Sequence, residues 1–214
     1  MASTKTDNHN PAAKIELRRH FLRKYHAYDL PNVLDCCQGG GVLWQLLRKE
    51  FEVASYWGLD LKPKKGRLKL DSVRVLAQPG WPQNVVDIDT YGSPWKHWVA
   101  MLPNIVRPVT VFLTIGQVQI GGCQLLKEAK EALELKDLHV PNAIAANLNR
   151  FAVPYLLAIA SRFVTIQEAI EANSDGNARY LGVRLEPRAK AAGCEAVTSS
   201  RPKHTEPVKE VRNV

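Results

Sequence analysis

Apolar residues follow two spacings along the chain, and the pattern predicts strands and helices in alternation. Short apolar runs, typical of buried strands, alternate with stretches in which apolar residues recur every three or four positions, as in amphipathic helices. Such alternation predicts an α/β fold, a mostly parallel sheet with helices on both faces. Helices are expected at 15–25, 42–51, 94–102, about 125–133 and 154–163, and strands at 32–36, 53–61, 67–76, 85–89, 108–115, 164–172 and 178–185.

The last two expected strands are joined by a short polar segment that contains Asp175-Gly176. An Asp-Gly pair between two strand-like runs is a strong signal for a tight hairpin. The final pair of strands should therefore be antiparallel, unlike the rest of the sheet.

A chain of 214 residues with 45% hydrophobic content can bury one core of ordinary size. We expect one domain at 13–190, between disordered tails at 1–12 and 191–214. No apolar run approaches the roughly 18 to 20 residues that span a bilayer. The first ten residues lack the apolar core of a secretory signal. The sequence thus predicts a cytoplasmic protein without a membrane span.

The four cysteines are expected to be free thiols, because two are adjacent and the others lie far away in sequence. Neither Cys-x-x-Cys nor His-x-x-x-His occurs, so no metal site is expected.

Lysine and arginine outnumber acidic residues by 29 to 21, which gives a net charge of +8. The excess gathers in two places. Such patches suit a nucleic-acid partner, although a basic surface can equally serve solubility alone. The predicted patches consist of Arg18, Arg19, Arg23 and Lys24, and of Lys62, Lys64, Lys65 and Arg67.

A glycine-rich turn follows the first expected strand, with Asp35 at its tip and a helix beyond it. Glycine lets the backbone approach a ligand closely, although a tight strand-to-helix connection needs it too. The spacing Asp-x-x-x-Gly-x-Gly resembles the first motif of class I S-adenosylmethionine-dependent methyltransferases. A dinucleotide motif would need glycine at Trp44, which argues against a dehydrogenase. The resemblance implies a Rossmann-like seven-stranded fold that ends in an antiparallel hairpin strand, with cofactor contacts from Asp35, Gln38, Gly39 and Gly41.

Asp60 ends the second expected strand, 25 residues after Asp35. A carboxylate there can accept hydrogen bonds from both ribose hydroxyls, but an aspartate at a strand end also serves as a turn former or helix cap. Asp71 and Ser72 match the positions at which family members contact the adenine amino group.

The segment Asp87-Ile88-Asp89-Thr90-Tyr91-Gly92-Ser93-Pro94 ends the fourth parallel strand. It is similar to the Asp-Pro-Phe/Tyr-Gly-Ser-Pro motif of tRNA guanine N2-dimethyltransferases and resembles other base-amino methyltransferases. The likeness covers about residues 30–116. A buried strand followed by a capped helix would read much the same.

The resemblance implies catalytic roles for Asp89 and Tyr91. Asp89 would accept a hydrogen bond from the amino group and redirect its lone pair, and Tyr91 would stack on the base. Substrate contacts would come from Tyr91, Gly92, Ser93 and Pro94. Thr90 departs from the motif's proline, which leaves room for a protein that binds the cofactor without methylating.

The helix that follows this motif is assigned no role in the site. Trp95 and Trp98 are expected in the core, because aromatics three apart on a helix usually pack inward. Lys96 and His97 are expected in solvent.

Three functions stay open at this point. The first is an S-adenosylmethionine-dependent methyltransferase for an exocyclic amino group of an RNA or DNA base. The second methylates a small molecule or a protein, because amide methyltransferases use similar residues. The third is a non-catalytic module with the same fold that binds the cofactor or nucleic acid. The base and the oligomeric state stay open.

Overall fold

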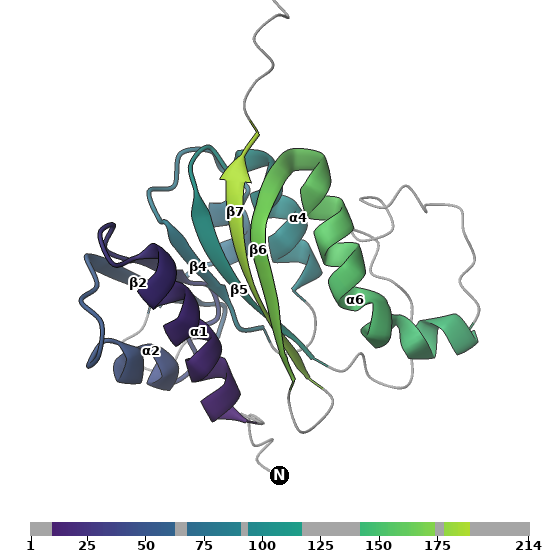
Figure 1. The fold of residues 1–214 in the computed structure, drawn as a ribbon, viewed down its shortest axis with the longest axis horizontal. Helices are drawn as coiled ribbons and strands as arrows, with labels where there is room; N and C mark the ends of the chain where they lie inside the picture. The colour runs from purple at the N-terminus through teal and green to yellow at the C-terminus, as the bar shows by residue number, and fades with distance from the viewer. Residues whose placement is uncertain (1–9, 63–67, 91–93, 117–141, 174–177, 189–214) are drawn as a thin grey trace, which may run out of the picture.

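The computed structural model describes residues 10–62, 68–90, 94–116, 142–173 and 178–188, with the backbone alone described at 142–151 and at 173. Seven strands form one sheet in the order β3-β2-β1-β4-β5-β7-β6 (Figure 1). The elements are α1 (Pro11–Tyr25), β1 (Asn32–Asp35), α2 (Val42–Leu47), β2 (Ser55–Asp60), β3 (Leu68–Lys69), α3 (Ser72–Leu76), β4 (Val85–Ile88), α4 (Trp95–Met101), η1 (Leu102–Asn104), β5 (Val109–Ile115), α6 (Asn142–Phe163), β6 (Val164–Asn173) and β7 (Arg179–Pro187).

The pairing of the strands confirms the predicted α/β sheet. β3, β2, β1, β4 and β5 are parallel neighbours. β7 pairs antiparallel with both β5 and β6, so the final hairpin is inserted beside the fifth strand. The carboxyl ends of β2, β1 and β4 lie next to one another, which is where open α/β sheets bind ligands.

Helices cover the two faces of the sheet (Figure 1). Each face has its own cluster of buried apolar side chains. α3, α4 and α6 pack on one face, with Trp95 and Trp98 buried there as predicted. α1 and α2 pack on the other. Along β4, Val86 and Ile88 belong to the first cluster and Val85 to the second. Side chains alternate along a strand, so Asp87 lies on the α1 and α2 face.

α1 lies close against the sheet at Gly182 of β7. A Cβ atom at this glycine would lie 2.5 Å from Cε2 of Phe21, so only glycine allows the helix to pack this closely. Leu17 and Phe21 are buried there, Phe21 edge-on against Phe112. The apolar stripe that predicted this helix therefore also fixes its position.

Two predicted elements are wrong in part. The expected strand 67–76 is a short β3 followed by α3, because the Asp71 carboxylate caps the helix by accepting a hydrogen bond from the Val73 amide at 3.0 Å. The helix expected from Pro154 instead begins at Asn142, with Pro154 inside it. Proline costs one backbone hydrogen bond, but the apolar burial of Leu156 and Ile159 on the sheet continues past it.

The other expected elements agree to within a few residues at their ends. The helix expected near 125–133 lies outside the described residues. None of the described helices has the length and apolar character to cross a bilayer.

Candidate active site

The glycine turn after β1 is tied to the end of β2. Gly39 and Gly41 have φ angles of 48° and 67°, a conformation that favours glycine. The Gly39 amide donates to Oδ2 of Asp60 at 3.0 Å, and the Lys62 amide donates to Oδ1 at 2.8 Å. A carboxylate has about four acceptor positions. Asp60 therefore shapes the turn and keeps acceptor capacity for the two hydroxyls of a ribose.

A chain of hydrogen bonds joins the first two strand tips. Nε2 of Gln38 donates to the Tyr56 hydroxyl at 3.1 Å, and that hydroxyl donates to Oδ2 of Asp35 at 2.6 Å. Burial and the Asp35 carboxylate raise the pKa of Tyr56, so the phenol keeps its proton. Gly58 lies against the Gln38 amide, where a Cβ atom would clash. The Gln38 side chain thus packs against β2, where its amide is hydrogen-bonded to Tyr56.

Asp35 is buried at the end of β1, opposite Asp87 in the β1–β4 register. Burial and the neighbouring Asp87 charge raise the pKa of Asp35 to about 7, although the Tyr56 hydrogen bond opposes them. A nearby positive charge would stabilise the ionised form of this carboxyl and lower its pKa again. Asp35 is therefore suited to a cationic ligand.

Ser72 and His97 meet behind the first strand tip. The Ser72 hydroxyl donates to the Cys36 carbonyl at 2.8 Å and lies 2.9 Å from Nε2 of His97. Burial lowers the pKa of His97 to about 4, so the ring is neutral. The prediction that His97 lies in solvent is wrong, because His97 lies on the side of α4 that faces α3. Asp71 is the α3 cap, and its adenine contact, like that of Ser72, stays a prediction.

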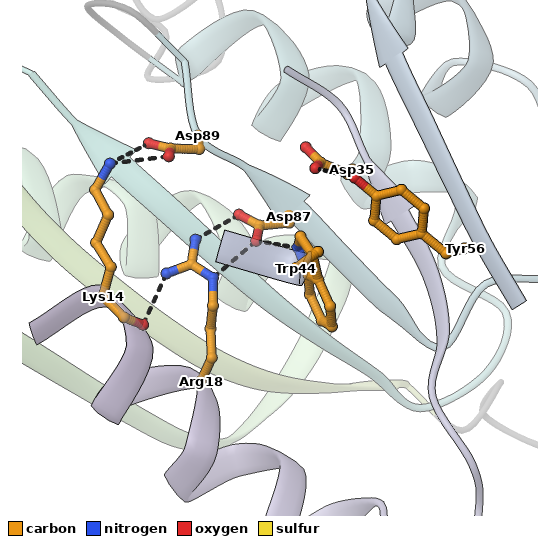
Figure 2. Close-up of polar contacts among 7 residues, drawn as sticks. All are labelled: Lys14, Arg18, Asp35, Trp44, Tyr56, Asp87 and Asp89. Carbon is orange, nitrogen blue, oxygen red and sulfur yellow. Dashed lines mark hydrogen bonds and ion pairs between the residues drawn. The ribbon is translucent and has the colours of Figure 1, made fainter. Parts of the chain in front are cut away.

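Arg18 is buried at the centre of the α1 face, and its assignment to the basic nucleic-acid patch is wrong. Its guanidinium donates to both carboxylate oxygens of Asp87, at 2.8 and 2.6 Å, and to the Lys14 carbonyl at 2.9 Å (Figure 2). Nε1 of Trp44 donates to the same carboxylate at 2.7 Å. A buried carboxylate needs such partners, so Arg18 is an internal counterion and not a surface contact.

The other described members of the predicted patches lie at the surface in varied settings. Arg19 pairs with Glu16 and Glu50, and Lys24 pairs with Glu168 at 2.7 Å. Arg23 and Lys62 are exposed. Lys64, Lys65 and Arg67 lie outside the described residues.

Asp89, directly after β4, is held by a lysine from α1. Nζ of Lys14 lies 2.6 Å from Oδ1 and 2.9 Å from Oδ2 (Figure 2). Burial raises the pKa of Asp89, but Lys14, Arg18 and the Thr114 hydroxyl outweigh it, and the net pKa is lower than usual. The carboxylate is therefore ionised and can accept a hydrogen bond. Figure 2 shows Asp35, Asp87 and Asp89 side by side at the strand tips.

Of the remaining predicted site residues, the structure describes Pro94. Pro94 is buried and stands immediately before α4, which begins one residue later than expected, at Trp95. Tyr91, Gly92 and Ser93 lie outside the described residues.

Sequence reasoning missed Lys14, Trp44 and Tyr56. The first could have been suspected, because Lys14 and Arg18 are one helical turn apart while Asp87 and Asp89 are two apart on a strand. Among the described residues, no group of three or more His, Cys, Asp or Glu side chains could hold a metal ion. Cys36 and Cys37 are free thiols, as predicted.

No protein-family model matches the chain, and no curated protein matches it by sequence. Solved structures do match. Trm1 from Pyrococcus horikoshii, solved with S-adenosyl-L-methionine, superposes with a TM-score of 0.57 at 18% identity over 87% of this chain. This chain spans 59% of the length of that protein.

Two further structures are methyltransferases solved with S-adenosyl-L-homocysteine. The N-methyltransferase NodS from Bradyrhizobium japonicum has a TM-score of 0.51 at 9% identity, covering 87% of this chain and 92% of NodS. The plantazolicin methyltransferase BpumL has a TM-score of 0.51 at 9% identity, covering 86% and 87%. Together with the strand order and the closing antiparallel hairpin, these matches show that the chain has the class I methyltransferase fold.

Proposed function

We propose that this protein is an S-adenosylmethionine-dependent methyltransferase that acts on an exocyclic amino group of a nucleic-acid base. One observation carries the proposal: the glycine turn, Asp35, Asp60 and Asp89 meet at the carboxyl ends of three adjacent parallel strands. Ligand sites of open α/β sheets lie at this edge. The structures with the same fold, solved with S-adenosyl-L-methionine or its demethylated product, support the choice of cofactor.

The residues present fit this cofactor. Its two ribose hydroxyls match the remaining acceptor positions of Asp60. The turn has positive φ angles at Gly39 and Gly41, and these glycines have no side chains to keep the cofactor away from the backbone. Its positive charge suits Asp35, whose buried carboxyl would ionise more readily beside a cation. When bound, the cofactor supplies an electrophilic methyl group on a sulfonium sulfur.

Asp89 is proposed to orient the acceptor. An aromatic amino group is a poor nucleophile, because its lone pair is delocalised into the ring. A hydrogen bond from its N–H to the ionised Asp89 favours a pyramidal nitrogen. The nitrogen then bonds to the methyl carbon as the carbon–sulfur bond breaks, and one N–H proton is lost to water. Tyr91 is assigned the stacking role, and Gly92, Ser93 and Pro94 the neighbouring contacts.

Two features support a nucleic-acid substrate: the motif around Asp89 and the exposed basic residues. Arg23 and Lys62 are exposed, and Arg19 and Lys24 are at the surface in ion pairs. We place the protein in the cytoplasm and expect its RNA or DNA affinity to fall as salt rises.

A second candidate is a module that binds the cofactor without methylating. The observation in its favour is that Lys14 already occupies both oxygens of Asp89, next to Thr90 in place of proline. The methylation of small molecules or proteins is the remaining alternative.

The test combines binding and transfer. Titration calorimetry with S-adenosylmethionine and its demethylated product, with a nicotinamide dinucleotide as the control, measures cofactor choice. Incubation with methyl-labelled cofactor and unmodified tRNA transcripts, DNA or protein extract then measures transfer. Label in RNA or DNA amino groups supports the proposal. Cofactor binding without transfer to any of them favours the non-catalytic module, and no binding at millimolar concentration contradicts both.

A further inference from the structure

Lys14 makes the closest contact to the candidate catalytic carboxylate. Its ammonium bridges both oxygens of Asp89, at 2.6 and 2.9 Å (Figure 2). The Lys14 side chain is only 4% exposed, whereas 19% of the Asp89 side chain remains exposed. Charge-assisted hydrogen bonds to both oxygens hold the plane of the carboxylate. The open part of Asp89 is left to accept from another group.

Lys14 belongs to a firmly packed helix. One turn later, Arg18 of α1 forms the buried pair with Asp87 and donates to the Lys14 carbonyl. A further turn along, Phe21 packs against Gly182. Moving α1 away would leave the buried charges of Arg18 and Asp87 unpaired, which is costly. Lys14 is therefore held in place beside Asp89 by the packing of α1.

Two cations from α1, Lys14 and Arg18, pair with the two carboxylates Asp89 and Asp87. Lys14 and Arg18 face Asp89 from α1, Asp87 precedes it on β4, Asp35 and Cys37 approach from the β1 side, and the Thr114 hydroxyl approaches from β5. The Lys14 ammonium also lies 5.1 Å from the centre of the Tyr180 ring. A cationic acceptor at Asp89 would therefore be repelled by the neighbouring Lys14 ammonium, whereas a neutral amino group would not be repelled.

We propose that Lys14 is a positioning residue that fixes Asp89 for hydrogen bonding and restricts the acceptor to neutral amino groups. This role rests on the proposed function, in which Asp89 accepts a hydrogen bond from the acceptor's N–H. Aromatic and amide amino groups are neutral at pH 7, while alkylamines are cationic. The substrate class that fits is therefore a nucleobase or an amide and not a lysine side chain or polyamine.

The first readout is the pH profile of methyl transfer in Lys14→Met, which keeps an unbranched side chain one atom shorter and removes its charge. Without its counterion, the partly buried Asp89 should protonate at higher pH. A protonated Asp89 has lost acceptor strength, so the acidic limb of kcat should move up by about one pH unit or more. Lys14→Arg should restore the profile. The control Lys49→Met removes a lysine that is exposed and lies outside both predicted basic patches.

The second readout needs no activity. In carboxyl-carbon NMR, the Asp89 signal should titrate at higher pH in Lys14→Met than in the wild type. Adding n-butylamine at neutral pH should move this signal in Lys14→Met and leave it unchanged in the wild type. If Lys14→Met does not fold by circular dichroism, Lys14→Gln, which keeps an N–H donor without the charge, replaces it in both experiments.

The two readouts separate the possible failures. A wild type that methylates no acceptor contradicts the proposed function, while the NMR titration still tests the Lys14–Asp89 relationship. Transfer that is equally fast in Lys14→Met across the pH range would overturn the positioning role, and faster transfer would make Lys14 an inhibitor. An Asp89 titration unchanged in Lys14→Met, or a wild-type response to n-butylamine, overturns the positioning role equally.

Discussion

The backbone amide of Gly39 donates to the carboxylate of Asp60 over 3.0 Å, joining the glycine turn after β1 to the end of β2. The bond matters because Gly39 and Asp60, which are predicted to contact the cofactor from two different strand tips, support each other's position. Changes to either side should therefore disturb cofactor binding.

Asp60→Ala should weaken binding of S-adenosylmethionine by roughly 10- to 100-fold, because hydrogen bonds to a charged group contribute about 1.5–3 kcal/mol each and the turn loses its anchor. Titration calorimetry measures the dissociation constant. Glu50→Ala removes an exposed carboxylate outside the site and should bind the cofactor like the wild type. An unchanged dissociation constant in folded Asp60→Ala would exclude Asp60 as the ribose ligand.

Asp89→Ala should separate catalysis from cofactor binding. The lost hydrogen bond acts on the acceptor amino group, so kcat should fall about a hundredfold or more while the cofactor dissociation constant stays within a few-fold. Single-turnover methyl transfer and calorimetry measure the two quantities. Loss of cofactor binding by a folded Asp89→Ala protein, or full activity, would contradict the role given to Asp89.

Cofactor affinity should rise with pH through about 7 and then level off. Asp35 is protonated below its pKa of about 7, so a cationic ligand must displace a proton there, whereas above it the carboxylate is already ionised. Calorimetry in buffers of different ionisation enthalpy should detect proton release near neutral pH. Tyr56→Phe removes a hydrogen bond that lowers this pKa, and should shift the rise to higher pH. A flat dependence in both proteins would show that Asp35 does not respond to the cofactor's charge.

Arg18→Met should lower the free energy of unfolding by about 3–5 kcal/mol, because it leaves the carboxylate of Asp87 buried without its counterion. Urea denaturation at pH 7 measures the change. Arg19→Met, which breaks exposed ion pairs one residue away, should change stability far less. Equal effects of the two substitutions would show that the buried pair contributes no more than a surface one.

Local pattern alone predicted much of the fold. Runs of apolar residues located most strands, the Asp-Gly turn predicted the antiparallel hairpin, and glycines after Asp35 located the turn at the strand tip. These features depend on neighbours in sequence, because periodicity and turn chemistry act over a few residues. Local competition explains the errors as well. Apolar residues after Asp71 read as strand, yet its capping carboxylate made them helix.

The charged interior was decided by tertiary structure. Lys14 and Asp89 are 75 positions apart, and nothing local indicates that one faces the other. In sequence, Arg18 is one member of a basic cluster, and only the packing of α1 on the sheet buries it against Asp87. The sequence by itself determined where the strand tips carry acidic residues. Which of these are neutralised, and which stay open to a ligand, followed from helix packing, because burial and counterions depend on contacts between distant segments.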